Sequence, residues 1–285
     1  MLSGQQSNAP GEQASLNGDH QTALRQYAAK DYKSAADSFQ KALASEPVGS
    51  PPYLQSTQLL GQSLYMLGRY QDAIAALKRA PKTGETLYML GNSALKARDL
   101  KASTTYFSEM FGVAPDSAAA HLLSAQLMMR QELLEEAEAE ARAAIRIDTK
   151  IPQAHYLLGE ILTFRGETEK AIEELNFEIR INPSFAMAYY KLGDAYSRQV
   201  RWDAAIPLLQ KSVWLNPTYS GPYILLGKGY LQSKELSNAE GVLRRAVQLD
   251  PNNSSAHYLL GQTLVQEGRT EEGRAMLQLS QKLKN

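Results

Sequence analysis

The six residues AHYLLG occur twice in this chain, at Ala154–Gly159 and at Ala256–Gly261, 102 residues further on. Because 102 is three times 34, a repeat of 34 residues would place related sequences between the two copies. Leu-Gly pairs stand at these intervals, at 158–159, 192–193, 226–227 and 260–261. Repetition at a fixed period constrains the fold strongly, because it predicts a row of similar units that each pack on their neighbours.

One repeat, AYYKLGDAYSRQVRWDAAIPLLQKSVWLNP at 188–217, shows how the unit is built. Its first half places apolar and small residues three or four apart from Tyr189 to Tyr196, which is the spacing of one helix face. Its second half does the same from Ala205 to Val213 and then ends at Pro217. Proline stops a helix because it has no N–H and restricts the residue before it. Each unit is therefore predicted to be a helix, a short turn, a second helix and a stop.

This pattern resembles the tetratricopeptide repeat, whose signature is an aromatic residue, Leu-Gly, Tyr, Ala, an apolar residue and Pro. The matching residues here are Tyr189, Leu192, Gly193, Tyr196, Ala205, Leu209 and Pro217. The next unit matches at Tyr223, Leu226, Gly227, Tyr230, Ala239, Leu243 and Pro251, and the preceding one at His155, Leu158, Gly159, Leu162, Ala171, Leu175 and Pro183. The last unit has Gly273 in place of the Ala and no closing Pro. The resemblance implies an all-α fold, a right-handed superhelical solenoid of helix-turn-helix repeats.

Eight repeats are predicted, at about 16–46, 54–81, 84–114, 118–150, 152–183, 186–217, 220–251 and 254–283. Near the front, the glycine position falls on Ala23, Gly61 and Gly91, at intervals of 38 and 30 residues that together equal two repeats. The stretch VGSPPY adds residues before the second repeat, and Pro81 shortens the second helix of that repeat. Residues 1–15 are polar with Gly and Pro and are predicted to be disordered, which leaves residues 16–285 as a single solenoid.

Composition excludes several classes of protein. Lys+Arg and Asp+Glu each total 30, so no basic excess favours nucleic acid as a partner. No apolar run approaches the ~20 residues that a membrane-spanning helix needs. The chain has no cysteine, which excludes disulfides and thiolate sites. The first fifteen residues lack the regions of a signal peptide, but both a cytoplasmic location and a periplasmic one, after loss of a signal or anchor, stay open.

Few residues offer catalytic or metal-binding chemistry. His121, His155 and His257 occupy the aromatic position of the first helix of their repeats, so they are interpreted as packing residues. No histidine has a second metal ligand at the spacing of an HExxH motif. Gly227-Lys228-Gly229 begins like a dinucleotide-binding loop, but residue 232 is Gln and no strand precedes it. We therefore expect no enzyme activity, with no catalytic residue, metal site or cofactor.

The resemblance places the binding surface on the first helices of the repeats, which line the concave side in this family. If the glycine of Leu-Gly is position eight, positions two, five, nine, twelve and thirteen should face the groove, and the last four lie on one helix stripe. The candidates at positions five and nine are Tyr88, Asn92, Gln126, Tyr156, Glu160, Tyr190, Asp194, Lys228, Tyr258 and Gln262.

The chemistry of these candidates suits a protein or peptide partner. Tyrosine combines a large contact area with few rotatable bonds and a hydroxyl, and it is enriched at interfaces. Glu160 and Asp194 add negative charge, which predicts a basic segment in the partner. The alternative is that the tyrosines at this position pack against the next helix instead.

The leading hypothesis is a non-enzymatic interaction scaffold or adaptor of bacterial type. The Lys and Asn clamp with which some family members grip acidic chaperone tails is absent; the matching residues are His20, Leu24, Gln58 and Gln62. A second hypothesis is a docking or regulatory segment of a larger enzyme or of a secretion or assembly component. Carbohydrate binding is less favoured, because the groove should be long and open. The C-terminal repeat keeps Met276, Leu277, Leu279 and Leu283 without a closing polar helix, which predicts a dimer, a partner or a longer parent chain there.

Overall fold

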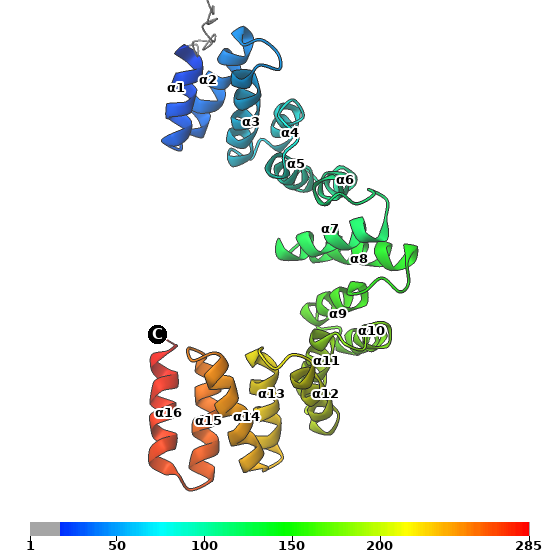
Figure 1. Cartoon of the computed structure of the whole chain (residues 1–285), viewed down its shortest axis with the longest axis vertical. Coiled ribbons are helices and arrows are strands. Elements are labelled where there is room, and N and C mark those ends of the chain that lie inside the picture. The colour runs from blue at the N-terminus through cyan, green and yellow to red at the C-terminus, as the bar shows by residue number, and fades with distance from the viewer. Residues whose placement is uncertain (1–17, 285) are drawn as a thin grey trace, which may run out of the picture. The chain divides into compact units, whose positions relative to one another are not determined.

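The computed structural model describes residues 18–284, which fold into sixteen α-helices without a strand (Figure 1). The first six helices are α1 (Gly18–Ala28), α2 (Tyr32–Ser45), α3 (Pro51–Met66), α4 (Tyr70–Leu77), α5 (Gly84–Lys96) and α6 (Leu100–Phe111). They are followed by α7 (Ala118–Arg130), α8 (Leu134–Ile147), α9 (Ala154–Phe164), α10 (Thr168–Ile181), α11 (Ala186–Arg198), α12 (Trp202–Leu215), α13 (Ser220–Gln232), α14 (Leu236–Leu249), α15 (Ser254–Gln266) and α16 (Thr270–Lys282). The predicted all-α fold is confirmed, whereas the segment predicted to be disordered lies outside the described residues.

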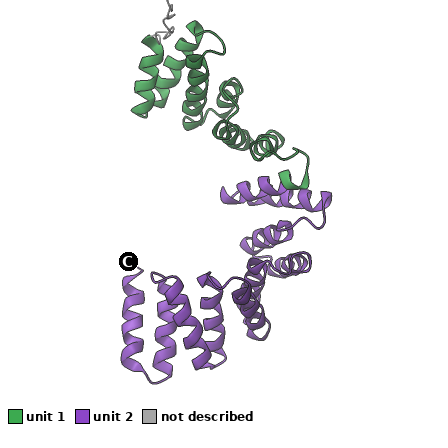
Figure 2. Cartoon of the chain, viewed as in Figure 1, with its two compact units in different colours: residues 1–120 green, residues 121–285 purple. Residues whose placement is uncertain are grey.

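The chain divides into two compact units, residues 1–120 and residues 121–285 (Figure 2). In the first unit, α1 packs on α2, α3 on α4, and α5 on α6. In the second unit, the pairs are α9 with α10, α11 with α12, α13 with α14, and α15 with α16. First helices of successive pairs also touch there, α9 with α11, α11 with α13, and α13 with α15. The odd-numbered helices from α9 to α15 therefore form a continuous layer.

The turn inside every helix pair is made by a residue in the left-handed backbone conformation. These residues, with φ between 60° and 85°, are Lys30, Gly68, Arg98, Glu132, Gly166, Val200, Lys234 and Gly268. Glycine adopts this conformation freely, whereas a side chain with a branched Cβ is strained in it. Val200, with φ of 60°, is the strained member of the series.

The two helices of a pair approach closely because the repeat glycine faces a large side chain sixteen residues later. A Cβ built on Gly159 would lie 2.8 Å from Leu175 Cγ, a distance that real Cβ atoms do not reach. The fourth repeat has Ala125 and Ala141 at the equivalent positions, and both are fully buried. The Leu-Gly signature is therefore a packing rule, in which the glycine makes room for a side chain of the second helix.

The two irregular intervals near the front come from the ends of α3 and α4. Pro51 and Pro52 stand in the first turn of α3, where an N–H has no helical acceptor, and the Ser50 hydroxyl accepts a hydrogen bond from the Tyr53 amide at 3.3 Å. The additional residues thus lengthen α3 to 16 residues. Helix α4 has only 8 residues and ends before Pro81, as the sequence predicts.

Candidate protein-binding groove

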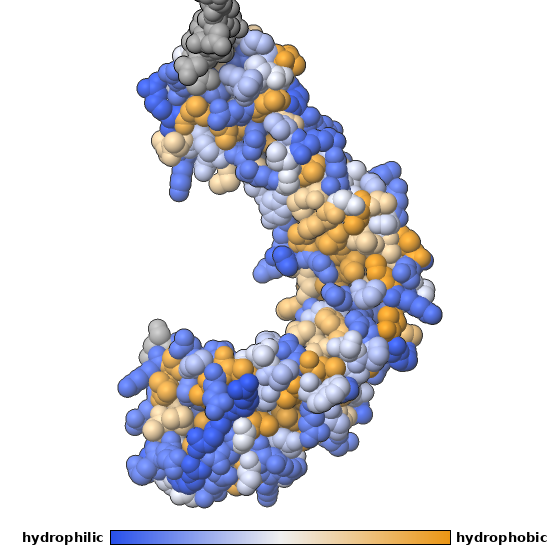
Figure 3. Space-filling model, in the orientation of Figure 1, coloured by the Kyte–Doolittle hydropathy of each residue, from blue (hydrophilic) through white to orange (hydrophobic). Residues whose placement is uncertain are grey.

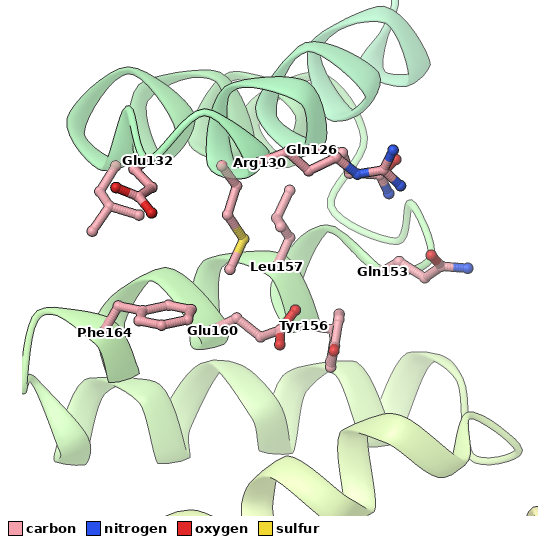
Figure 4. Close-up of a pocket in the computed structure, with 10 residues that line it drawn as sticks. Gln126, Arg130, Glu132, Gln153, Tyr156, Leu157, Glu160 and Phe164 are labelled. Carbon is pink, nitrogen blue, oxygen red and sulfur yellow. The ribbon is translucent and has the colours of Figure 1, made fainter. Parts of the chain in front are cut away.

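A pocket lies between α7 and α9 in the second unit, and we call it the anchor pocket (Figure 4). Its volume is about 900 Å³. Its walls combine apolar side chains with amides and charged groups at the rim. The lining residues are Gln126, Met129, Arg130, Glu132, Leu134, Gln153, Tyr156, Leu157, Glu160 and Phe164.

A second pocket, of about 410 Å³, runs along α11 and α13 to the start of α15, and we call it the tyrosine pocket. It is lined by Tyr190, Asp194, Tyr219, Ser220, Gly221, Ile224, Leu225, Lys228, Asp250, Asn253 and Ser255. The two pockets therefore collect six of the ten candidates predicted at positions five and nine, namely Gln126, Tyr156, Glu160, Tyr190, Asp194 and Lys228.

Tyr156 and Tyr190 are half-buried, because each packs edge-on against the aromatic residue that precedes the next first helix. The ring of Tyr156 is 5.0 Å from that of Phe185, and the ring of Tyr190 is 5.5 Å from that of Tyr219. Burial, and after it the charge of Glu160, raise the pKa of the Tyr156 phenol well above its usual range. These tyrosines thus pack against the next repeat, which was the alternative interpretation, and they line the pockets as well.

Burial also raises the pKa of the Tyr190 phenol, to about 12, and the neighbouring Tyr219 and Asp194 add to the effect. A phenol in this environment stays neutral at physiological pH and keeps its hydroxyl as a hydrogen-bond donor and acceptor. The tyrosine pocket therefore presents a polar but uncharged aromatic wall.

The two acidic candidates are already paired with cations. Glu160 Oε1 lies 2.7 Å from Lys191 Nζ, and Asp194 Oδ2 lies 3.0 Å from Arg198 Nε. Both cations come from α11. The sequence analysis treated the two carboxylates as free negative charges, because it could not show these partners. Since their charge is compensated within the chain, they give no support to a basic segment in the partner.

The other four candidates lie outside the two pockets. Asn92 is only 4 % exposed and donates from Nδ2 to the Tyr88 carbonyl at 3.0 Å, so it offers little surface to a ligand. Tyr88 itself is 47 % exposed, in the first unit. Tyr258 is 43 % exposed and accepts a hydrogen bond from Gln262 Nε2 at 2.9 Å in the last repeat.

The sequence argument missed the apolar part of the anchor pocket. Phe164 is 69 % exposed at the end of α9, and Met129 and Leu157 lie beside it in the pocket wall. Met129 and Phe164 occupy positions twelve and thirteen of their repeats, which the predicted stripe included but the candidates did not. Figure 3 shows hydrophobic residues gathered over the region of α7 to α9.

A buried carboxylate on α10 holds the start of α9 in place. Glu178 is fully buried, and its two oxygens accept hydrogen bonds from the Gln153 amide at 2.8 Å and the Tyr156 amide at 3.3 Å. Gln153 has a left-handed φ of 72° and its own side chain does not cap the helix. Glu178 therefore replaces the missing cap and positions the backbone of the anchor pocket.

The histidines have structural roles in the described residues. His155 Nδ1 lies 2.6 Å from Glu174 Oε2, and His121 Nδ1 lies 2.7 Å from Glu140 Oε2, which joins the two helices of each pair. His257 is buried, with Nε2 at 2.8 Å from a backbone carbonyl. Within residues 18–284, no cluster of three His, Cys, Asp or Glu side chains could hold a metal ion.

Two expectations concern the surface of the chain as a whole. None of the helices among the described residues is both long and apolar enough to cross a membrane. In the C-terminal repeat, Leu279 is exposed, whereas Met276, Leu277 and Leu283 are partly buried. Some of this apolar surface is thus exposed, as the sequence predicts.

Comparison with known proteins gives a consistent family assignment along the chain. Family profiles described as tetratricopeptide repeat match residues 20–86, 88–152, 188–223 and 230–283. A further profile, described as TPR repeat, matches residues 159–200. No curated protein matches the chain.

Solved structures of similar fold include YrrB, described as a TPR protein with an unusual peptide-binding site, with 20 % identity and a TM-score of 0.54 over 63 % of this chain and 93 % of that one. MamA from Desulfovibrio magneticus RS-1, from residue 41 to its end, has 24 % identity and a TM-score of 0.54 over 59 % of this chain and 96 % of that one. Another MamA structure has 20 % identity and a TM-score of 0.53 over 60 % and 93 % of the two chains. At these identities the likeness shows a shared fold.

Proposed function

Because the chain belongs to the tetratricopeptide repeat family, we propose that it is a non-enzymatic interaction scaffold that binds a segment of a partner protein in the groove of its second unit. The groove comprises the anchor pocket and the tyrosine pocket, which lie along α7, α9, α11 and α13. A peptide is the class of ligand described for YrrB, and an open groove of this kind suits an extended or helical segment.

The observation that carries the proposal is the exposure of Phe164 beside an apolar wall. Its ring is 69 % exposed to solvent, although the adjoining pocket of about 900 Å³ contains Leu157 and Met129. Burying such a ring against a partner would remove apolar surface from water, which is the main source of binding energy at protein interfaces. Aromatic residues are enriched at protein interfaces, and a few large side chains carry most of the binding energy there.

The polar groups of the groove can form hydrogen bonds with the backbone of a bound peptide. Gln126 and Gln153 place amide side chains along the anchor pocket, and each can both donate and accept. Tyr190 and Tyr219 add hydroxyl groups in the tyrosine pocket. A peptide backbone lying along these groups would find partners for its own N–H and C=O groups, which would otherwise lose their bonds to water.

The proposal is tested with peptides selected from a random displayed library against the full chain. The affinity of the best peptide is then measured for the wild type, for Phe164→Ala and for Trp214→Ala. Trp214 is a matched control, because it is 72 % exposed but lies on α12, a second helix. We expect Phe164→Ala to weaken binding by about 2 kcal/mol, roughly thirtyfold, and Trp214→Ala to leave it unchanged.

Thermal melts of both variants are the folding control, because neither side chain is buried and neither change should alter stability by more than about 0.5 kcal/mol. Equal affinity for the wild type and Phe164→Ala would contradict the proposal, and so would a loss confined to Trp214→Ala. Either result would place the binding surface away from this groove.

A further inference from the structure

We infer that the anchor pocket selects a segment in which one large apolar side chain is flanked by an acidic residue on one side and a basic residue on the other. The inference rests on the proposed function, since it names the kind of segment that this groove would accept. Its basis is the distribution of paired and unpaired charges around an apolar centre.

The centre of the anchor pocket is apolar and adaptable. Met129 from α7 and Leu157 from α9 both line it, and Figure 4 shows Phe164 at one end. Methionine fits side chains of different shape, because its thioether chain is unbranched and polarisable. The volume of about 900 Å³ exceeds what one aliphatic side chain fills, so a large anchor such as Phe, Trp, Met or Leu, together with part of its backbone, suits the pocket.

Two charges at the rim have no partner within the described part of the chain. Arg130 and Glu132 are both exposed, and neither makes an ion pair among residues 18–284. The third charged group of the pocket, Glu160, is neutralised by Lys191 at 2.7 Å. The charges available to a ligand are therefore one cation and one anion.

The two unpaired charges lie at opposite ends of the pocket. In Figure 4 the Glu132 carboxylate lies on the side of Phe164. The side chain of Arg130 extends the other way, toward Gln126 and Gln153. The backbone explains this separation, because Arg130 is the last residue of α7 and Glu132 has a left-handed φ of 60° in the turn that follows. The chain changes direction between them, and their side chains diverge.

Complementarity then fixes the order of charges on the ligand. A carboxylate near Arg130 and a cation near Glu132 would each be attracted, whereas the reversed segment would meet like charges at both ends. The pocket thus favours one orientation of the segment. A neutral apolar segment would leave both rim charges without a partner.

The test uses the peptides selected against the full chain, now with selections repeated on Arg130→Glu and on Glu132→Lys. Arg146→Glu is the control, because Arg146 is an exposed cation on α8, outside the pocket. We expect wild-type peptides to share an apolar residue with an acidic residue on one side and a basic residue on the other. Arg130→Glu should replace only the acidic preference with a basic one, and Glu132→Lys should replace only the basic preference with an acidic one.

Affinities give the same result in quantitative form. Each charge reversal in the pocket should weaken the parental peptide by about fivefold to tenfold, and a peptide with the corresponding charge reversed should recover the loss. The difference should shrink as salt rises, because exposed charges are screened. Arg146→Glu should change neither the preference nor the affinity.

The outcomes separate this inference from the proposed function. If Phe164→Ala abolishes binding but the charge reversals change neither the preferences nor the affinities, the groove binds peptides and the inference is wrong. The inference is also wrong if both reversals shift preference at the same peptide position. If Phe164→Ala leaves affinity unchanged, it is the proposed function that fails.

Discussion

Gly193 on α11 lies so close to Leu209 on α12 that a Cβ added to the glycine would be 2.8 Å from Leu209 Cγ. The same relationship, a glycine and a large side chain sixteen residues later, recurs along both units. The pairs are Gly61 with Leu77, Gly91 with Phe107, Gly159 with Leu175, Gly227 with Leu243 and Gly261 with Leu277. The glycine of the Leu-Gly pair, which makes the repeat visible in the sequence, is therefore the point at which the two helices of the repeat meet.

The first prediction follows from this contact. Gly193→Ala should destabilise the chain by about 1–3 kcal/mol, because the added methyl overpacks the interface with Leu209. Gly241→Ala is the control, since Gly241 lies inside α14 with open space around its Cα. That change should stabilise the chain by about 0.5–1 kcal/mol through helix propensity. Chemical denaturation of the two variants measures both effects, and two changes of the same sign would contradict the account.

The strained turn at Val200 gives the second prediction. Its φ of 60° costs a residue with a Cβ about 1–2 kcal/mol, and its side chain is exposed and loses little packing when removed. Val200→Gly should therefore raise the free energy of unfolding by up to about 1 kcal/mol, after the entropy cost of glycine. Gly166→Val, at the same turn of the preceding repeat, should lower it. A destabilised Val200→Gly variant would show that the turn carries no strain.

The third prediction concerns the cap of α9. Glu178→Ala should cost about 2–3 kcal/mol, because it leaves the Gln153 and Tyr156 amides without their buried acceptor. Glu173→Ala, an exposed position on the same helix, should stay within about 0.5 kcal/mol of the wild type. Hydrogen exchange localises the effect, with faster exchange expected at the start of α9. Equal stability of the two variants would show that Glu178 does not stabilise the start of α9.

The fourth prediction is a loss of stability in alkali. The pKa of Tyr190 is raised to about 12 from the ordinary value of 10.0, so between these values the folded chain holds a proton that the unfolded chain has released. The contribution is complete below pH 10 and is lost as pH rises through about 12. Tyr190→Phe should therefore lose less stability than the wild type over this range, whereas Tyr88→Phe, at an exposed position, should follow the wild type. Denaturation curves at several pH values measure the loss of stability, and phenolate absorbance follows the titration of the tyrosines. An ordinary pKa for Tyr190 in the folded chain would contradict the prediction.

The sequence was sufficient for features that depend on local pattern. The helix pairs follow from apolar spacing, and the short α4 follows from Pro81. The sequence shows that Gly273 stands in the last repeat where most of the other repeats have alanine, but it does not explain why. The structure supplies the explanation, because a Cβ there would lie 2.6 Å from Val265 Cγ2 and 2.7 Å from the Gly261 carbonyl oxygen.

Features of the groove that depend on contacts between repeats could not be predicted. The burial of Tyr156 depends on Phe185, which lies 29 residues later and comes from the start of the next helix pair. The charge of Glu160 is cancelled by Lys191 across the same boundary. Glu178 takes its role from a left-handed residue that precedes another helix. Each effect needs side-chain positions that the period of a repeat does not fix.

The most direct test of groove binding is photo-crosslinking from two exposed aromatic positions of the full chain. A p-benzoylphenylalanine is placed at Phe164 in one protein and at Trp214 in another, positions that are 69 % and 72 % exposed. Each protein is irradiated with a saturating amount of the selected peptide, and the adducts are quantified by mass spectrometry. The account predicts a peptide adduct from position 164 and none from position 214. An adduct from position 214, with none from position 164, would place the binding surface on the second helices and contradict it.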